Sequence, residues 1–86
     1  MPEPKNALGP VIKEIRLAAG WSLEQLASGL THEGWTCAAD QLERVESQEV
    51  GIKDFELLYF SAALGVSADE LWKRLMQKRS QPHAIT

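Results

Sequence analysis

The chain has 86 residues, with nine basic and twelve acidic side chains and a formal net charge of -3. A chain of this length forms one small domain, whose single core gives modest stability unless a partner adds to it. The negative balance opposes the basic balance expected of a nucleic-acid-binding protein, so composition alone does not indicate DNA.

The cysteine count and the apolar runs exclude several other classes. Cys37 is the one cysteine, which excludes an intramolecular disulfide and a four-cysteine zinc module. His32 and His83 are the only histidines, and they lack metal-ligand spacing, so we expect no metal and no cofactor. No apolar run approaches the length of about eighteen residues that spans a membrane, and no export signal opens the chain. We therefore expect a cytoplasmic protein.

The chain divides into two end segments and a helical domain. Residues 1–7, with prolines at 2 and 4, and residues 80–86, without periodicity, are expected to be a flexible arm and a flexible tail. Residues 8–79 carry apolar side chains at helical spacings of three and four. The sequence therefore predicts an all-α, compact five-helix bundle.

The first two helices have clear start signals. The first is expected from Pro10 to Ala19, because proline suits a first turn and Gly20 suits the residue after the end. Its inward-facing residues are expected to be Val11, Ile12, Ile15 and Ala19. Ser22 and Gln25 form a capping-box signature that opens the second helix. Its apolar residues follow at i, i+3, i+4 and i+7: Leu23, Leu26, Ala27 and Leu30.

The third helix has an unusually narrow apolar stripe. After a polar turn over residues 31–36, Thr36 is the expected N-cap of a helix from Cys37 to about Ser47. Its apolar stripe consists only of Ala38, Leu42 and Val45. The rest of this helix is therefore expected to face solvent or a ligand.

The fourth and fifth helices are also amphipathic. Asp54 is the expected cap of a helix from Phe55 to Leu64, ended by Gly65, and Ser67 with Glu70 forms a capping box for the last helix. Phe55, Leu58, Trp72 and Met76 are large apolar residues of these two helices. They are either ordinary core or an exposed patch that forms a dimer, and the sequence leaves both interpretations open.

The second and third expected helices have the pattern of a helix-turn-helix module: a short helix, a turn and a helix with a thin apolar stripe. Three segments, GWSLEQLA at 20–27, LERVES at 42–47 and ALGVSADEL at 63–71, resemble the Cro/C1 (XRE) family of phage and bacterial repressors. The third segment is the most specific, because its cap, glycine and apolar spacing must all coincide. Gly34-Trp35 and the sequence VESQ at 45–48 resemble a subgroup with a lengthened turn before the recognition helix.

The resemblance implies a lambda-repressor-like domain that binds double-stranded DNA as a homodimer. The third helix would enter the major groove, the second would lie across the backbone, and the half-sites would lie roughly 34 Å apart. Arg44 would donate to guanine, while Asp40 or Glu43 would accept from cytosine. The full candidate DNA-binding set is Thr36, Ala39, Asp40, Gln41, Glu43, Arg44, Gln48 and Lys53.

Several phosphate-contacting residues of the family pattern are replaced in this chain. Leu23 stands where the family favours glutamine, Ala38-Ala39 where it has a polar pair, and Val50-Gly51 where the subgroup often has two arginines. Affinity would therefore have to come from backbone amides, a second subunit or the remaining cations, which are Lys13, Arg16 and Lys53.

The acidic third helix keeps a second function open. Between residues 37 and 49 the chain has four acids and one base, and Asp40 can pair with Arg44 at i, i+4 on a merely solvated surface. Glu46 is expected to have a structural role. The first hypothesis is a sequence-specific, dimeric DNA-binding transcriptional regulator. The alternative is a degenerate helix-turn-helix fold that binds a protein partner, with weak or no DNA binding. No constellation indicates an enzyme or a small-molecule substrate.

Overall fold

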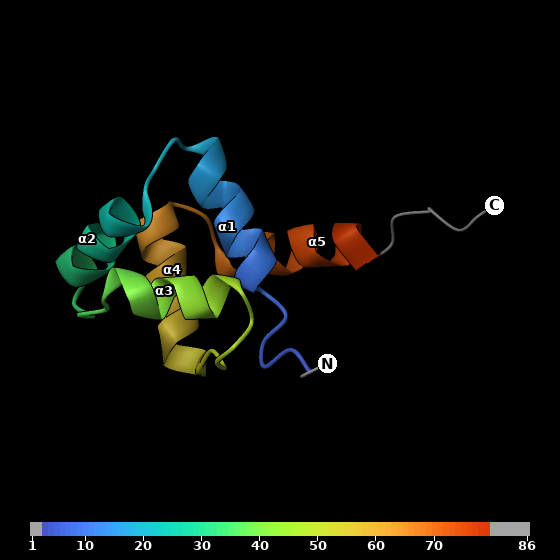
Figure 1. The fold of residues 1–86 in the computed structure, drawn as a ribbon. Helices are drawn as coiled ribbons and strands as arrows, with labels where there is room; N and C mark the ends of the chain where they lie inside the picture. The colour runs from blue at the N-terminus through green and yellow to red at the C-terminus, as the bar shows by residue number, and fades with distance from the viewer. Residues whose placement is uncertain (1–2, 80–86) are drawn as a thin grey trace.

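The computed structural model describes residues 3–79, which form five α-helices and no strand. In chain order the helices are α1 (Gly9–Ala18), α2 (Leu23–Glu33), α3 (Ala39–Glu46), α4 (Asp54–Leu64) and α5 (Ala68–Arg79). The expected all-α, five-helix class is confirmed (Figure 1). Within the described residues, no helix has both the length and the apolar character needed to cross a membrane. The expected tail, residues 80–86, lies outside the described residues.

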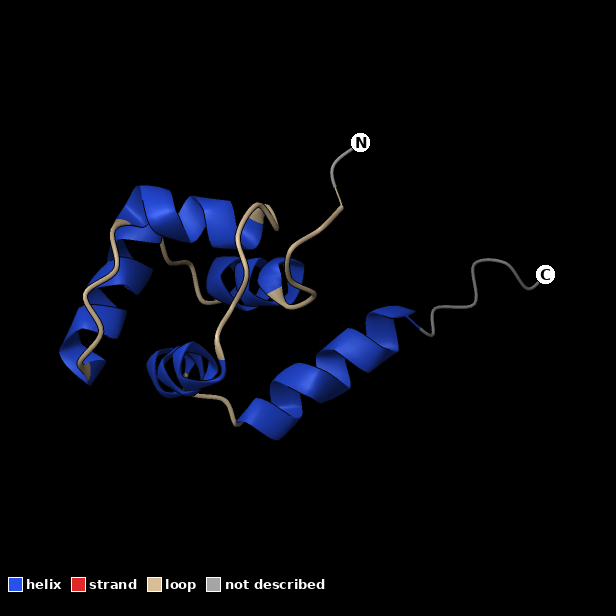
Figure 2. Ribbon diagram, turned by 90° about the horizontal axis from the view of Figure 1, so that it is seen from below, coloured by secondary structure: helices blue, strands red, loops and turns tan. Residues whose placement is uncertain are grey.

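The helices pack around one apolar core. α2 packs against α3 and α4, while α1 packs against α3, α4 and α5. Figures 1 and 2 both show the far end of α5 extending past the other four helices. The buried apolar residues come from all five helices, from the residue before α1 and from the segment between α2 and α3: Leu8, Val11, Ile12, Ile15, Leu26, Leu30, Cys37, Leu42, Val45, Phe60, Leu64, Leu71 and Leu75.

α1 follows the sequence except at its end. It begins one residue before Pro10, and Val11, Ile12 and Ile15 are buried as expected. The inward position predicted for Ala19 is wrong, because α1 ends at Ala18 and Ala19 is exposed. The backbone then turns at Gly20, whose φ of 77° is a conformation that glycine adopts without strain.

α2 begins where the sequence predicts and ends later. Ser22 Oγ accepts a hydrogen bond from the Gln25 amide at 3.1 Å, and Gln25 Oε1 accepts one from the Ser22 amide at 2.7 Å, which confirms the capping box. The polar turn expected from residue 31 is wrong, because α2 continues to Glu33. The Thr31 hydroxyl donates to the Ala27 carbonyl inside the helix at 3.1 Å. The helix ends only at Gly34, in the left-handed conformation with a φ of 113°.

α3 begins two residues later than the sequence predicts. Thr36 is not its N-cap: Ala38, with an extended backbone, occupies the cap position without a side-chain hydrogen bond. Cys37 is buried in the core, and Ala38 is exposed instead of lying on the apolar stripe. Leu42 and Val45 are buried as expected.

α4 and α5 have local caps of different kinds. Asp54 is the first residue of α4 and not its cap, and the Glu56 carboxylate accepts from the Lys53 amide at 2.9 Å. Gly65 ends α4 with a φ of 72°, as predicted. Ser67 Oγ accepts from the Glu70 amide at 3.0 Å and so caps α5. These side chains satisfy backbone amides that have no partner within the helix.

A buried ion pair fixes the end of α3 to α1. Arg16 Nε lies 2.7 Å from Glu46 Oε2, Arg16 Nη2 lies 3.0 Å from Glu46 Oε1, and Arg16 Nη1 donates to the Trp21 carbonyl at 2.7 Å. The hydrogen bond to Glu46 raises the pKa of Arg16, while burial acts in the opposite direction. The structural role of Glu46 is confirmed. The expectation that Arg16 supplies DNA affinity is wrong, because its guanidinium is consumed inside the fold.

Candidate nucleic-acid interface

The outer face of α3 makes almost no contact with the rest of the fold. α3 buries Leu42, Val45 and Glu46 against the core. The other members of the helix are exposed or, for Ala39, half-buried: Ala39, Asp40, Gln41, Glu43 and Arg44. α2 packs against α3 and is joined to it by the segment after Gly34. A helix held by one narrow side and open on the other can present its side chains to a ligand.

An open hollow of about 680 Å³ lies beside this outer face, between α3 and the segment that leads into α4. Four of the predicted site residues line it: Asp40, Gln41, Arg44 and Lys53. Glu56 also lines it, and the rest of its wall is mostly apolar, with Trp35, Val45, Val50 and Ile52. Thr36 and Glu43 are exposed but do not line this hollow.

Arg44 is exposed, and the structure describes no ion pair to its guanidinium anywhere in residues 3–79. The pairing of Arg44 with Asp40 suggested by their spacing does not form. Apart from the Arg16–Glu46 pair, the ion pairs within residues 3–79 join Lys73 to Asp69, Arg74 to Glu70 and Lys78 to Glu14. The five donors of Arg44 are therefore available to an external acceptor.

The hollow is balanced in charge. Arg44 and Lys53 contribute two cations, and Asp40 and Glu56 contribute two anions. The Lys53 ammonium lies 5.9 Å from the centre of the Phe55 ring, and Lys53 remains exposed. A balanced surface gives little general attraction to a phosphate backbone, although its individual groups can still select between bases.

Gln48 is held within the fold. Its side-chain amide donates to the Asn6 carbonyl at 2.8 Å, and the residue is half-buried. Its backbone is in the left-handed region, with a φ of 67°, which is uncommon for a residue other than glycine. The structure therefore places Gln48 against the N-terminal segment, where its amide nitrogen serves the fold.

Two residues that the sequence analysis did not single out, Lys5 and Asn6, lie beside the loop that follows α3. Asn6 Nδ2 donates to the carbonyls of Val45 at 3.0 Å and Val50 at 2.7 Å, and Asn6 Oδ1 accepts from the Gly9 amide at 2.7 Å. Contacts with the domain thus begin earlier than residue 8. The three-residue spacing from Asn6 to Gly9, typical of a capping asparagine, was the one signal in the sequence.

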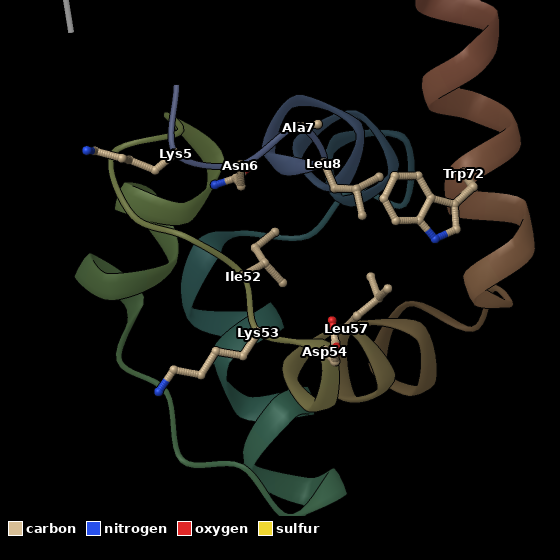
Figure 3. Close-up of a pocket in the computed structure, with 9 residues that line it drawn as sticks. All are labelled: Lys5, Asn6, Ala7, Leu8, Ile52, Lys53, Asp54, Leu57 and Trp72. Atoms are coloured by element: carbon tan, nitrogen blue, oxygen red, sulfur yellow. The ribbon is translucent and has the colours of Figure 1, made fainter. Parts of the chain in front are cut away.

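A second cavity, of about 180 Å³, lies behind this loop, between the N-terminal segment, α4 and α5 (Figure 3). Leu8, Ile52, Leu57 and Trp72 form its apolar wall. Figure 3 shows the ammonium groups of Lys5 and Lys53 pointing out of this cavity, both toward the side on which α3 lies. The two lysines therefore belong to the surface around α3 and not to the cavity interior.

Four large apolar residues of α4 and α5 are exposed, which excludes the core interpretation left open by the sequence. The exposed fractions are 52% for Phe55, 65% for Leu58, 46% for Trp72 and 48% for Met76. Exposed apolar residues that form a contiguous surface are typical of an interaction site. We call these four residues the α4–α5 patch.

Cys37 is buried in the core. Burial raises the pKa of its thiol, and the nearby carboxylates of Glu56 and Asp40 add to that effect. No group of three or more metal-ligating side chains occurs among the described residues, and His83 lies outside them. Cys37 is therefore a packing residue with a protonated thiol.

Comparison with models of known protein families, with curated proteins and with solved structures finds no match to this chain. A function therefore has to be inferred from the residues and the geometry of the chain itself.

Proposed function

We propose that this protein is a sequence-specific DNA-binding transcriptional regulator of the Cro/C1 type, which acts as a homodimer in the cytoplasm. α3 would enter the major groove and α2 would lie across the backbone, as in helix-turn-helix modules. The observation that carries the proposal is the exposed Arg44 guanidinium, which has no ion-pair partner in residues 3–79 although Asp40 stands four residues before it.

The chemistry of the outer face assigns a role to each side chain. The planar guanidinium of Arg44 matches the two acceptors of guanine, O6 and N7. The Gln41 amide matches adenine, which offers one donor and one acceptor, and the carboxylates of Asp40 and Glu43 can accept from the cytosine amino group. Thr36 and Lys53 can contact phosphates, which fix the position of the helix without specifying a sequence.

The same chemistry predicts selective but weak binding. Carboxylates on α3 repel phosphates. The logarithm of the binding constant falls linearly with the logarithm of the salt concentration, and each missing phosphate contact makes that slope shallower by about 0.9. We therefore expect a shallower salt dependence than a basic relative would show. Backbone amides at helix starts and a second subunit would supply part of the affinity.

Selection of binding sequences from random duplexes at about 50 mM salt tests this proposal, followed by gel shifts with the enriched duplex. Loss of a bidentate contact costs about 1 to 3 kcal/mol, so Arg44→Ala should weaken binding by roughly 5- to 150-fold. Arg44→Lys should also weaken it, because lysine lacks the planar fork. Arg74→Ala, which removes an arginine of α5, is the matched control and should bind like the wild type.

Failure to enrich any sequence, together with identical behaviour of Arg44→Ala and the wild type, would contradict DNA recognition by α3. The balanced charge of the hollow and the α4–α5 patch favour one second candidate, a helix-turn-helix fold that binds a protein. Protection of a specific duplex by the wild type at physiological salt would rule this second candidate out.

A further inference from the structure

The N-terminal segment lies along the loop after α3, although the two are far apart in the sequence. The Lys5 amide donates to the Gln48 carbonyl at 2.9 Å, and the Gln48 side chain returns a hydrogen bond to the Asn6 carbonyl at 2.8 Å. The Lys5 carbonyl lies 3.6 Å from the position that a Cβ on Gly51 would occupy. The backbone of Lys5 is thus held beside Gly51.

The side chain of Asn6 makes this arrangement specific. Its three hydrogen bonds reach the start of α1 through Gly9, the end of α3 through Val45 and the loop through Val50. Asn6 has two amide donors and a carbonyl acceptor, and all of these are used. Asn6 therefore fixes where Lys5 emerges relative to α3.

Residues 49–51 of the loop contain no cation. Val50 and Gly51 are uncharged, and Glu49 is acidic. Lys5 is exposed and forms no ion pair within residues 3–79, and its ammonium points toward the side of α3 together with that of Lys53 (Figure 3). A positive charge placed there can reach a phosphate of a duplex whose major groove holds α3.

We infer that Lys5 contacts the DNA backbone and supplies the positive charge that Val50 and Gly51 do not, with Asn6 as the residue that positions it. This inference rests on the DNA-binding function proposed above. It adds a phosphate contact that comes from the N-terminal segment instead of from the helix-turn-helix module.

The test measures how the affinity for the enriched duplex depends on salt concentration, in Lys5→Gln and in the wild type. Removing one phosphate contact should lower the log–log slope by about 0.9. Between 50 and 200 mM salt, the affinity of the variant should therefore fall about 3.5-fold less than that of the wild type. Its order of preference among duplexes should not change, because phosphates carry no sequence information.

Lys73→Gln is the matched control, because it removes an exposed lysine from α5. A second comparison tests whether Asn6 positions Lys5. In a protein that already carries Asn6→Ala, adding Lys5→Gln should change the salt slope little further. Circular dichroism checks that both variants are folded. An unchanged slope in Lys5→Gln, with a wild type that binds DNA, overturns the inference and leaves the proposed function intact. An equal loss of slope in Lys73→Gln also overturns it. A wild type that binds no duplex overturns both.

Discussion

At the scale of single residues, Gly9 lies where the start of α1 meets the end of α3. A Cβ atom on Gly9 would lie 2.3 Å from the Val45 carbonyl oxygen and 3.0 Å from the Glu46 carbonyl oxygen. Both are backbone atoms, so neither can rotate away as a side chain can. Glycine is required here because two helices approach closely, and not because of an unusual φ.

Gly9→Ala should therefore lower the free energy of unfolding by about 1 to 3 kcal/mol, as overpacked sites do. Gly29→Ala is the matched control: its Cβ would meet only the Ala63 Cβ, at 3.7 Å, which is an ordinary contact. Because alanine favours a helix over glycine, Gly29→Ala should raise stability by about 0.5 to 1 kcal/mol. Urea denaturation measures both, and equal effects of the two substitutions would refute this explanation.

The sequence could not distinguish these two glycines. Gly9 stands beside the expected start of the first helix and Gly29 stands within the second, and neither place indicates a close contact. Only the path of α3 past α1 makes Gly9 essential. The same reason explains why Asn6 was missed, since its hydrogen-bond partner in the loop lies 44 residues away. Contacts between distant segments leave no local pattern to read.

At the scale of elements, α3 differs from α2 and α5 at its start. Ser22 and Ser67 cap α2 and α5 with side-chain hydrogen bonds, whereas Ala38 offers none to α3. Ala38 nevertheless has the extended conformation of a cap residue, with φ of -77° and ψ of 154°. The first turn of α3 therefore has backbone amides that no cap side chain accepts from.

Ala38→Ser should supply the missing acceptor and raise the stability of the domain by about 0.5 to 2 kcal/mol. Ala39→Ser, one residue further and inside the helix, should not, because a serine there cannot cap the first turn and serine has a lower helix propensity than alanine. The midpoints of urea denaturation compare the two. No gain in Ala38→Ser would show that the first turn of α3 is already satisfied by other means.

The elements that the sequence predicts well are those decided by neighbouring residues. The Ser22–Gln25 capping box, the Ser67 cap and the end of α4 at Gly65 are local, and the structure has all three. The end of α2 and the start of α3 were misplaced because they depend on the burial of Cys37 and on the turn at Gly34. Four of the residues predicted from helical spacing and loop position do line one hollow: Asp40, Gln41, Arg44 and Lys53.

At the scale of the whole molecule, the apolar surface and the candidate DNA surface involve different helices. The α4–α5 patch lies on α4 and α5, and the candidate base-reading residues lie on α3. An isologous dimer formed through the patch would leave both copies of α3 open. Such a dimer is the arrangement that two half-sites require.

If the proposed homodimer forms through the patch, Leu58→Glu should convert it into a monomer, because it places a charge in the surface that the dimer would bury. Leu17→Glu changes an equally apolar and exposed leucine of α1, 57% exposed, and should leave the dimer intact. Sedimentation equilibrium measures both, with thermal melting as a check on folding. A wild type that is monomeric at high concentration, or two variants that behave alike, would contradict a dimer through this patch.

The burial of Cys37 has a practical consequence for studying motion in this protein. Cys37 is 3% exposed and the pKa of its thiol is raised, so the reactive thiolate is both inaccessible and scarce in the folded state. Alkylation of this single cysteine can therefore proceed only when the corner between α2 and α3 opens, and its rate measures how often that happens. The chain thus contains an intrinsic chemical probe, just before the helix on which recognition is proposed to depend.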